Sequence, residues 1–477
     1  MKYISKITVS LIYYLLFPYS LFAQSFISDS PEKDNAVLLA PIRKEILKKY
    51  LEDSATVTGE NKKYIIKYFR GLYDCLDDMF NKNEIISSVE TNAYLIRLVK
   101  EIQNNNPALQ KLGTRFLFSK VYWPNASSFG EGTIVFNIGM FTKLDNEAQV
   151  VFILCHELGH LFLDHSNKGI YKYVNTAYSD EFQEELKKIK KSHFQQNKQL
   201  DELKKELVFN SRRHGREHEG EADSLGLLFM SHTSYDTKEA LTTLALLDSV
   251  DKEIYDAEKG LPVYFNFKEY PFQPSWIAKP QSNFFGGISK PDEEEIKLSD
   301  SLKTHPDCKV RVKKLALSLN KINTQGDKKF IVHQQQFLQL REQFKFDIID
   351  YCFSSNWVSR SLYYSMELFK IYPDNAYLAK MIGKCFNTFY ENQKVHRLST
   401  IVDMPSPYVD QKYNIVLKFI ENIRMDDMSA ISYYFMKQHQ DQFKTDKDFV
   451  LELIKSKDAF NKPEEKNEWL SYYKKTF

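Results

Sequence analysis

The sequence predicts a mainly α protein with a small β-sheet, divided into a first domain that contains the sheet and a second, helical domain. Apolar residues recur at helical spacing through most of the 477 residues. Two short segments between residues 114 and 137 are instead rich in β-branched and aromatic residues, as strands are. The length also exceeds one ordinary domain, because hydrophobic cores stop growing at about 250–300 residues.

The composition is that of a folded protein without a charge-driven partner. Hydrophobic residues make up 43% of the chain and charged residues 27%, so the chain can bury a core. Lys and Arg number 65 against 63 for Asp and Glu, a net charge of +2 that predicts no nucleic-acid partner. The five cysteines match no metal or disulfide spacing, so we assign no bridge and expect at least one free thiol.

The N-terminus has the pattern of a signal peptide over residues 1–23. Two lysines accompany the start of an apolar run over residues 7–22, and the small residue Ala23 follows. We therefore expect an exported, periplasmic protein, with secretion as an alternative. An uncleaved anchor is the weaker alternative, because Ser10 and Pro18 interrupt a run shorter than the ~20 residues of a membrane helix. No other stretch is long enough, so we expect no integral membrane segment after cleavage.

The first domain is assigned to residues 24–323. Helical spacing over residues 35–51 and 62–103 predicts a helical N-terminal layer. Residues 114–120 and 133–137 are short and β-branched, and they predict the strands of the sheet.

Further helices should follow the sheet. One should begin at Asp145 or Asn146, either of which can cap it, and end near Leu163 with its apolar residues on one face. A charged insertion over residues 180–207 predicts an exposed helix, and a buried helix over residues 214–230 follows.

Two regions complete the chain. Residues 259–291 contain five prolines and many aromatic residues, which predict an irregular loop that packs onto something. Residues 324–477 are predicted to form the helical domain. Within it, the small, large and Pro/Gly positions between residues 361 and 386 match one tetratricopeptide-type hairpin, although a plain helical bundle explains the neighbouring helices nearly as well.

The chemistry is carried by an HExxH pattern, His156-Glu157-Leu158-Gly159-His160. A spacing of four on a helix places both imidazoles on one face, where they can bind one tetrahedral zinc ion. Glu157 lies beside them and can act as the base for a water molecule. The alternative is two ordinary histidines in a buried helix, so the rest of the sequence must supply a third ligand.

Two arrangements could supply that ligand. A His ten residues after the first, preceded by a turn-forming Gly, is excluded because Ser166 and Leu163 occupy those positions. His165 is expected on the apolar face, packed and hydrogen-bonded. Glu219 and Asp223 lie four apart on a second helix, so Glu219 is the predicted ligand and Asp223 can accept the remaining N–H of a ligating His. The neighbouring acidic residues are expected to point away: Glu217 and Glu221. A solvated, Glu-rich helix start is the alternative.

Together these motifs resemble the gluzincin metallopeptidases of family M48, which include the HtpX and prenyl-protein protease types. The absence of their membrane helices favours the soluble periplasmic branch of the β-barrel-assembly-enhancing protease, where a C-terminal tetratricopeptide module is also found. The resemblance covers residues 90–315. Besides HELGH it rests on Asn125-Ala126, the strand at 133–137 with Gly139, Leu144 to Ala148, Glu219 to Gly226 as ExxADxxG, Tyr235-Asp236, and His305-Pro306 followed by Arg311.

The resemblance implies further roles. One segment would be the edge strand that pairs with extended substrate: Thr133, Ile134, Val135, Phe136 and Asn137. His305 resembles a histidine that approaches the metal and holds a resting state, as a gate or fourth ligand, and Arg311 resembles a nearby support. A structural His-Pro turn is the alternative for His305. The insertion at 180–207 and the aromatic loop depart from the family's short linkers, so substrate access is expected to be controlled differently.

We therefore expect an exported zinc metalloendopeptidase, with one Zn²⁺ per chain bound by His156, His160 and Glu219. Glu157 would be its general base and acid. A protein or peptide is the expected substrate, in envelope protein quality control. The alternative is a chaperone-like protein that binds clients through its C-terminal helices, with proteolysis rare or gated. A zinc hydrolase of non-peptide substrates is a third possibility.

Overall fold

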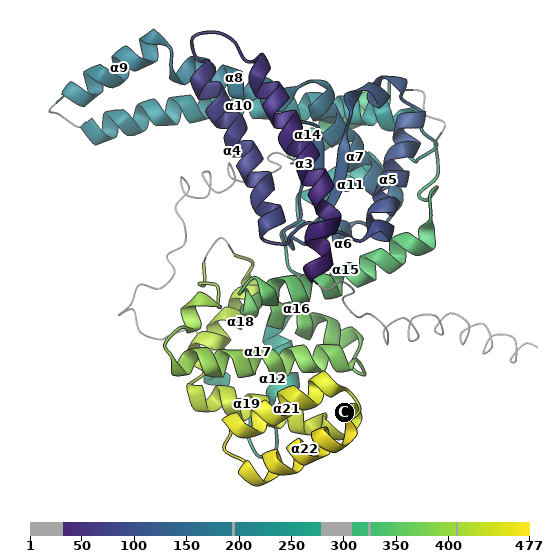
Figure 1. Ribbon diagram of the computed structural model, residues 1–477, viewed down its shortest axis with the longest axis vertical. Coiled ribbons are helices and arrows are strands. Elements are labelled where there is room, and N and C mark those ends of the chain that lie inside the picture. The colour runs from purple at the N-terminus through teal and green to yellow at the C-terminus, as the bar shows by residue number, and fades with distance from the viewer. Residues whose placement is uncertain (1–31, 193–195, 278–307, 323–325, 407–408) are drawn as a thin grey trace, which may run out of the picture. The chain divides into compact units, whose positions relative to one another are not determined.

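The computed structural model describes residues 32–192, 196–277, 308–322, 326–406 and 409–477. They are mostly helical and contain a three-stranded sheet (Figure 1). The predicted signal peptide and His305 lie outside the described residues. Within the described ranges, no helix combines the length and the apolar character needed to cross a membrane. All five cysteines are free thiols.

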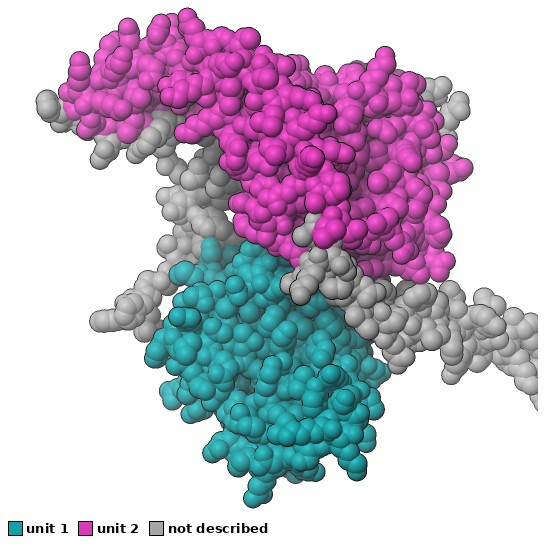
Figure 2. Space-filling model, viewed as in Figure 1, with its two compact units in different colours: residues 1–28, 252–295, 345–477 teal, residues 29–251, 296–344 magenta. Residues whose placement is uncertain are grey.

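The chain divides into two compact units (Figure 2). The metal-site unit lies within residues 29–251 and 296–344, and the C-terminal unit includes residues 252–295 and 345–477. This division differs from a predicted boundary at residue 323. Residues 252–277 belong to the C-terminal unit, and the unit boundary falls within a helix, α15 (Gln334–Ser354).

The metal-site unit is a helical assembly around the small sheet. Its N-terminal helices confirm the predicted helical layer, and α3 packs along α4 (Figure 1). The elements are α3 (Glu32–Thr56), α4 (Lys62–Asn81), α5 (Val89–Asn104), the 3-10 helix η1 (Pro107–Leu112), β1 (Arg115–Ser119), β2 (Ala126–Ser128), β3 (Thr133–Asn137), α6 (Ile138–Lys143), α7 (Glu147–Phe162), α8 (His165–Ala177), α9 (Asp180–Lys191), α10 (Gln196–Ser231), α11 (Glu239–Leu247), α14 (Cys308–Leu319) and the start of α15.

The sheet has the strand order β1-β3-β2, with β3 parallel to β1 and antiparallel to β2. Both predicted strands are present, and the sequence did not indicate β2. The prediction that residues 133–137 form an edge strand is wrong, because β1 and β2 pair with β3 on either side. The edge strand antiparallel to β3 is β2, which contacts α7.

Helix α7 carries the HExxH pattern and is buried around its whole circumference. It begins where predicted, because the Asn146 side chain accepts a hydrogen bond of 3.0 Å from the backbone N–H of Gln149. Every residue from Glu147 to Gly159 is buried, since β2, α5, α10 and α11 all contact this helix. The predicted single apolar face therefore understates the burial of α7.

A buried carboxylate at the start of α7 anchors a later segment of the chain. Glu147 is fully buried and accepts five hydrogen bonds, which satisfy both of its oxygens. The donors are the hydroxyls of Tyr94 and Tyr235 and the backbone N–H groups of Ile331, Val332 and His333. The segment that leads into α15 is thus held against the metal-bearing helix.

The charged insertion differs from its prediction. We expected one helix over residues 180–207 and a separate buried helix from residue 214, but α9 ends at Lys191 and α10 runs unbroken from Gln196 to Ser231. No proline interrupts α10, and a mid-helix glycine such as Gly215 costs only about 1 kcal/mol. The first part of α10 runs beside α9, and the two helices extend away from the rest of the metal-site unit (Figure 1).

Two glycines allow α7 and α10 to cross at close range. A Cβ atom on Gly226 would lie 2.9 Å from the backbone nitrogen of His156, and one on Gly159 would lie 3.2 Å from the carbonyl oxygen of Ala222. Larger residues at either position would force the helices apart. The crossing therefore sets the distance between the histidines of α7 and Glu219 of α10.

We predict that Gly226→Ala destabilises the protein and weakens metal binding. Overpacking against the backbone of His156 should cost about 1–3 kcal/mol, more than the ~1 kcal/mol that alanine gains in helix propensity. Urea unfolding and zinc titration measure the two effects. Gly215→Ala is the matched control on α10, because nothing lies within 4 Å of a Cβ there. Wild-type stability and zinc affinity in Gly226→Ala would contradict the role of the crossing.

The C-terminal unit is entirely helical in its described residues. Its α16 and α17 pack against each other as a helical hairpin at the predicted position, while a tetratricopeptide character stays a prediction. The elements are α12 (Ala257–Phe265), the 3-10 helix η2 (Pro274–Trp276), the end of α15, α16 (Val358–Ile371), α17 (Ala376–Lys394), the 3-10 helix η3 (Leu398–Thr400), α18 (Gln411–Asn422), α19 (Met425–Gln438), α20 (Gln440–Phe443), α21 (Lys447–Ala459) and α22 (Pro463–Thr476).

The aromatic segment predicted as an irregular loop contributes to the core of this unit. Its first part is helix α12, and residues 278–291 lie outside the described residues. The ring of Phe265 lies 5.0 Å from that of Phe386 and 5.9 Å from those of Phe419 and Phe435. This burial explains why the segment belongs to the C-terminal unit and not to the first domain.

An ion pair in the C-terminal unit makes its stability depend on pH. The Lys457 side chain is fully buried, and its Nζ lies 2.6 Å from Glu465 Oε2. Burial opposes ionisation of Glu465, but hydrogen bonds from Lys457 and Tyr433 outweigh it and lower the pKa of Glu465 to about 2. A lowered pKa in the folded state stabilises the protein above the unfolded value of 4.5, and this contribution is lost as the pH falls toward about 2.

We predict that Glu465→Gln is less stable than wild type near pH 7, because it leaves a buried ammonium without its carboxylate. The difference in unfolding free energy should narrow as the pH falls from 4.5 toward about 2. Denaturant unfolding across this range measures it, with the exposed neighbour Glu464→Gln as control. If the difference in unfolding free energy between wild type and Glu465→Gln stays constant with pH, the ion pair does not cause the pH dependence.

Candidate metal centre

Three side chains from two helices converge on one point. His156 and His160 project from successive turns of α7, and their Nε2 atoms lie 3.1 Å apart. Glu219 reaches them from α10, with Oε1 3.3 Å from His160 Nε2 and Oε2 3.6 Å from His156 Nε2. Tetrahedral zinc with bonds of about 2.0–2.1 Å places its ligand atoms about 3.3 Å apart. The donor types and spacings therefore fit a zinc ion with one open position.

The carboxylate of Asp223 holds the ring of His156. Its Oδ1 lies 3.0 Å from Nδ1 of His156, the nitrogen opposite the one that faces the other ligands. Donation from Nδ1–H to Asp223 leaves Nε2 with its lone pair free for a metal. Asp223 also lies on the same face of α10 as Glu219, as the four-residue spacing predicted.

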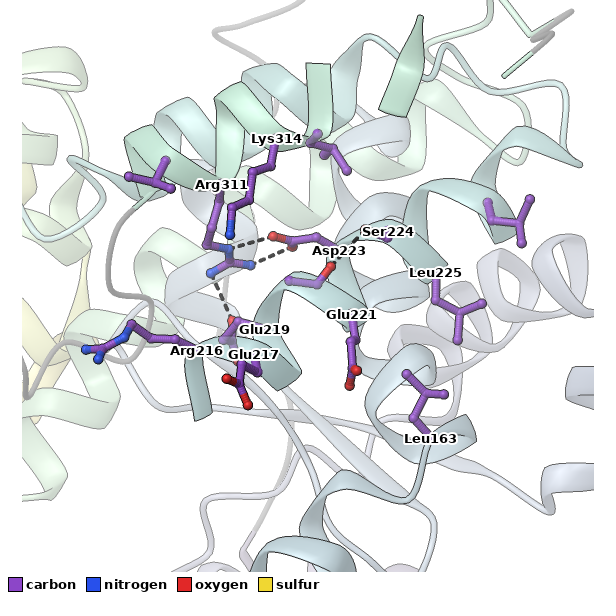
Figure 3. A pocket seen from close by; sticks show the side chains of 14 residues that line it. Leu163, Arg216, Glu217, Glu219, Glu221, Asp223, Ser224, Leu225, Arg311 and Lys314 are labelled. Carbon is purple, nitrogen blue, oxygen red and sulfur yellow. Dashed lines mark hydrogen bonds and ion pairs between the residues drawn. The ribbon is translucent and has the colours of Figure 1, made fainter. Parts of the chain in front are cut away.

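Arg311 of α14 binds both acidic residues (Figure 3). Two of its nitrogens lie 2.7 Å from the two oxygens of Asp223, and Nη1 lies 2.9 Å from Glu219 Oε2. Burial disfavours the charge on Asp223, but Arg311 and His156 outweigh it and lower the pKa of this carboxyl group. The guanidinium thus favours the ionised form of Asp223, and it pairs with Glu219 in the same site.

Glu157 shares a small pocket with the edge strand. Its side chain is 4% exposed and follows His156 directly on α7. The pocket is also lined by Ala126 of β2 and by Arg311. Its other lining residues are Met140, Phe152, Ile153, Leu244 and Leu247. Glu157, His156 and Ala126 of the edge strand β2 therefore line the same pocket.

A larger cavity of about 950 Å³ lies along α10 and α14 (Figure 3). Glu219 and Asp223 line it together with Arg311. Leucines line it as well, among them Leu163, Leu225, Leu228 and Leu315. The predicted metal site thus borders a cavity that has both charged and apolar lining residues.

His165 is packed and hydrogen-bonded as predicted, but it does not lie on the apolar face of α7. The helical wheel of α7 put His165 among apolar side chains, but Asp164 has a φ of 57° and ends the helix, so His165 begins α8. His165 is buried, and its Nδ1 lies 3.0 Å from His160 Nδ1. Glu221 is not grouped with Glu219 and the two ligating histidines, but its Oε2 lies 3.0 Å from His165 Nε2.

The ring of His165 also stacks on that of His218, with centroids 4.1 Å apart. Burial and the neighbouring His218 and His160 lower the pKa of His165 to about 4. The sequence signal that could have found this group is the short link between the helices, since only Leu163 and Asp164 separate α7 from α8. Because this link is so short, His165 at the start of α8 lies beside His160 at the end of α7.

A buried helix with two histidines, a carboxylate from a crossing helix and an adjacent Glu define a metal-dependent hydrolase. Comparison with protein families agrees, since residues 90–318 match the model of peptidase family M48. The match supports a metallopeptidase and contains His156, Glu157, His160, Glu219 and Arg311. A search of characterised proteins gave no match.

We predict that Arg311→Met destabilises the metal-free protein more than the zinc-loaded protein. Loss of the guanidinium leaves two buried carboxylates facing each other, which should cost about 3–5 kcal/mol, and a bound cation would offset part of this repulsion. Thermal unfolding with and without zinc measures the difference. Lys314→Met is the control on the same helix, because Lys314 is exposed. Equal destabilisation in both states would contradict this electrostatic role.

Proposed function

We propose that the chain is an exported, zinc-dependent endopeptidase of the gluzincin type that acts in envelope protein quality control. The observation that carries the chemistry is the convergence of His156, His160 and Glu219 with Glu157 beside them. Export and the envelope rest on the N-terminal signal-peptide pattern and on the resemblance to the soluble periplasmic branch. Client binding by the C-terminal unit stays a prediction.

The site supports hydrolysis of an amide bond. A zinc ion bound by these residues would polarise the scissile carbonyl and lower the pKa of a water from near 16 to about 7. Glu157 takes a proton from the attacking water and delivers it to the nitrogen of the leaving amine. Asp223 holds the ring of His156, and Arg311 pairs with both Asp223 and Glu219 while this happens.

The position of β2 at the edge of the described sheet supports a peptide as the substrate. Asn137 N–H donates to the carbonyl of Asn125, and Phe129 N–H donates to that of Thr133. In an antiparallel pair the bonded residues alternate, so the main-chain groups of Ala126 and Ser128 point away from β3. An extended peptide that adds to this edge would use these groups for its hydrogen bonds.

The position of Ala126 aligns such a peptide with the catalytic residues. Ala126 lines the same pocket as His156 and Glu157. A peptide paired with β2 would therefore pass its backbone beside the base. This assigns to β2 the substrate-pairing role that the sequence had suggested for residues 133–137.

We predict that Glu157→Gln retains one zinc per chain while hydrolysis of an unfolded protein substrate falls by about 10²- to 10⁴-fold. The amide preserves the shape of the side chain but cannot accept the proton. Metal analysis and a fluorescent casein assay measure the two properties, and Glu90→Gln, an exposed change on α5, is the control. Full activity in Glu157→Gln, or no zinc in the wild type, would overturn the proposed function.

A further inference from the structure

We propose that His165 and Glu221 are positioning residues, which form a hydrogen-bonded chain that fixes the ring of His160 and strengthens its hold on the metal. This inference rests on the proposed zinc site. It concerns two residues that are not metal ligands. It gives a role to His165 and Glu221, which the catalytic step does not use.

The hydrogen-bonded chain starts on the nitrogen of His160 that faces away from the other predicted metal ligands. Nε2 of His160 faces His156 and Glu219, whereas Nδ1 lies 3.0 Å from Nδ1 of His165. Nε2 of His165 then lies 3.0 Å from Oε2 of Glu221. His165 is 5% exposed, so its ring is largely shielded from water, while Glu221 is 59% exposed.

The protons can be placed in one consistent way. A neutral imidazole has one donor nitrogen and one acceptor nitrogen. If His160 offers its Nε2 lone pair to a metal, its proton is on Nδ1 and is donated to Nδ1 of His165. His165 then carries its proton on Nε2 and donates it to Glu221. Each contact holds a single proton, and the chain ends on a carboxylate.

This arrangement gives the second histidine what Asp223 gives the first. Nδ1 of His156 lies 3.0 Å from Asp223 itself, and Nδ1 of His160 is linked to Glu221 through His165. Partners of this kind fix the tautomer and orientation of a ligating imidazole and raise its basicity. Both ligating rings of α7 are therefore held by a carboxylate from α10, one directly and one through an intervening imidazole.

The same residues could instead form a second metal site, because donor atoms of His165, His218 and Glu221 lie within 4.8 Å of one another. Ring geometry argues against it. The rings of His165 and His218 are nearly parallel, at 7°, so their in-plane lone pairs do not converge on one ion. The rings of His156 and His160 are inclined at 75°, as a shared ion allows.

Proton placement also argues against a second ion. A metal on Nε2 of His165 would require a proton on its Nδ1. The metal on Nε2 of His160 requires a proton on Nδ1 of His160 as well. Two N–H groups would then face each other across 3.0 Å. The observed contact suits a hydrogen bond between the rings, and thus a chain in which His165 binds no metal itself.

The test measures the zinc dissociation constant by chelator competition in the full-length protein. His165→Leu removes the acceptor, and Glu221→Ala removes the terminal carboxylate, so each should weaken zinc binding by about 10- to 100-fold. His165→Asn keeps an oxygen near the position of Nδ1 and should recover part of the loss. His218→Ala is the matched control, because His218 stacks on His165 but is not in the chain.

Absorption of the Co²⁺-substituted protein adds a readout that a purely structural role would not move. Its ligand-field bands should shift in His165→Leu and return toward the wild-type spectrum in His165→Asn. If His165→Leu does not fold, Glu221→Ala decides, because the Glu221 side chain is 59% exposed and its loss should spare the fold.

Three results would overturn the proposal. Wild-type zinc affinity in Glu221→Ala and in folded His165→Leu would remove the chain from the account while leaving the proposed function intact. A second equivalent of zinc in the wild type, lost in His218→Ala, would show a metal site instead. A wild-type protein that binds no zinc would remove both this inference and the proposed function.

Discussion

The close crossing of α7 and α10 is the constraint on which the site depends. Gly226 lies against the backbone of His156, and Gly159 lies against that of Ala222, so the two helices approach without intervening side chains. Only at this distance can a carboxylate from α10 reach both imidazoles of α7. The buried environment of α7 and the anchored segment at Glu147 hold the first helix in place, and α14 supports the second through Arg311.

The electrostatics of the site follow from that crossing. It brings Glu219, Asp223 and Glu221 of α10 within reach of three histidines, in a region where unpaired charges would be costly. Arg311 balances two of the carboxylates, and the third lies partly in solvent at the end of the imidazole chain. A divalent cation would complete the balance. The ligands are thus oriented before the metal binds, which limits the entropy lost when it does.

Much of this site could be predicted from the sequence, because helical periodicity relates residues four apart. The spacing placed His156 with His160 and Glu219 with Asp223. Asp145 or Asn146 was predicted to begin α7, and Asn146 caps it. Helical periodicity gave the wrong position for His165, because α7 ends before it. The left-handed backbone conformation of Asp164 turns the chain so that His165 faces His160. Local sequence patterns also do not show which strands pair with each other. The three-residue strand β2 gave no signal, and the edge position that the family resemblance implied for residues 133–137 belongs to β2.

The central claim is that two imidazoles of α7 and a carboxylate of α10 bind one zinc ion. X-ray absorption at the zinc edge tests it most directly in the zinc-loaded protein. The account predicts two imidazole nitrogens and one or two oxygens at about 2.0–2.2 Å, with no sulfur shell. In His160→Ala the spectrum should lose one imidazole, which would show that this ligand comes from α7. A sulfur shell near 2.3 Å, or an unchanged spectrum in that variant, would contradict the account.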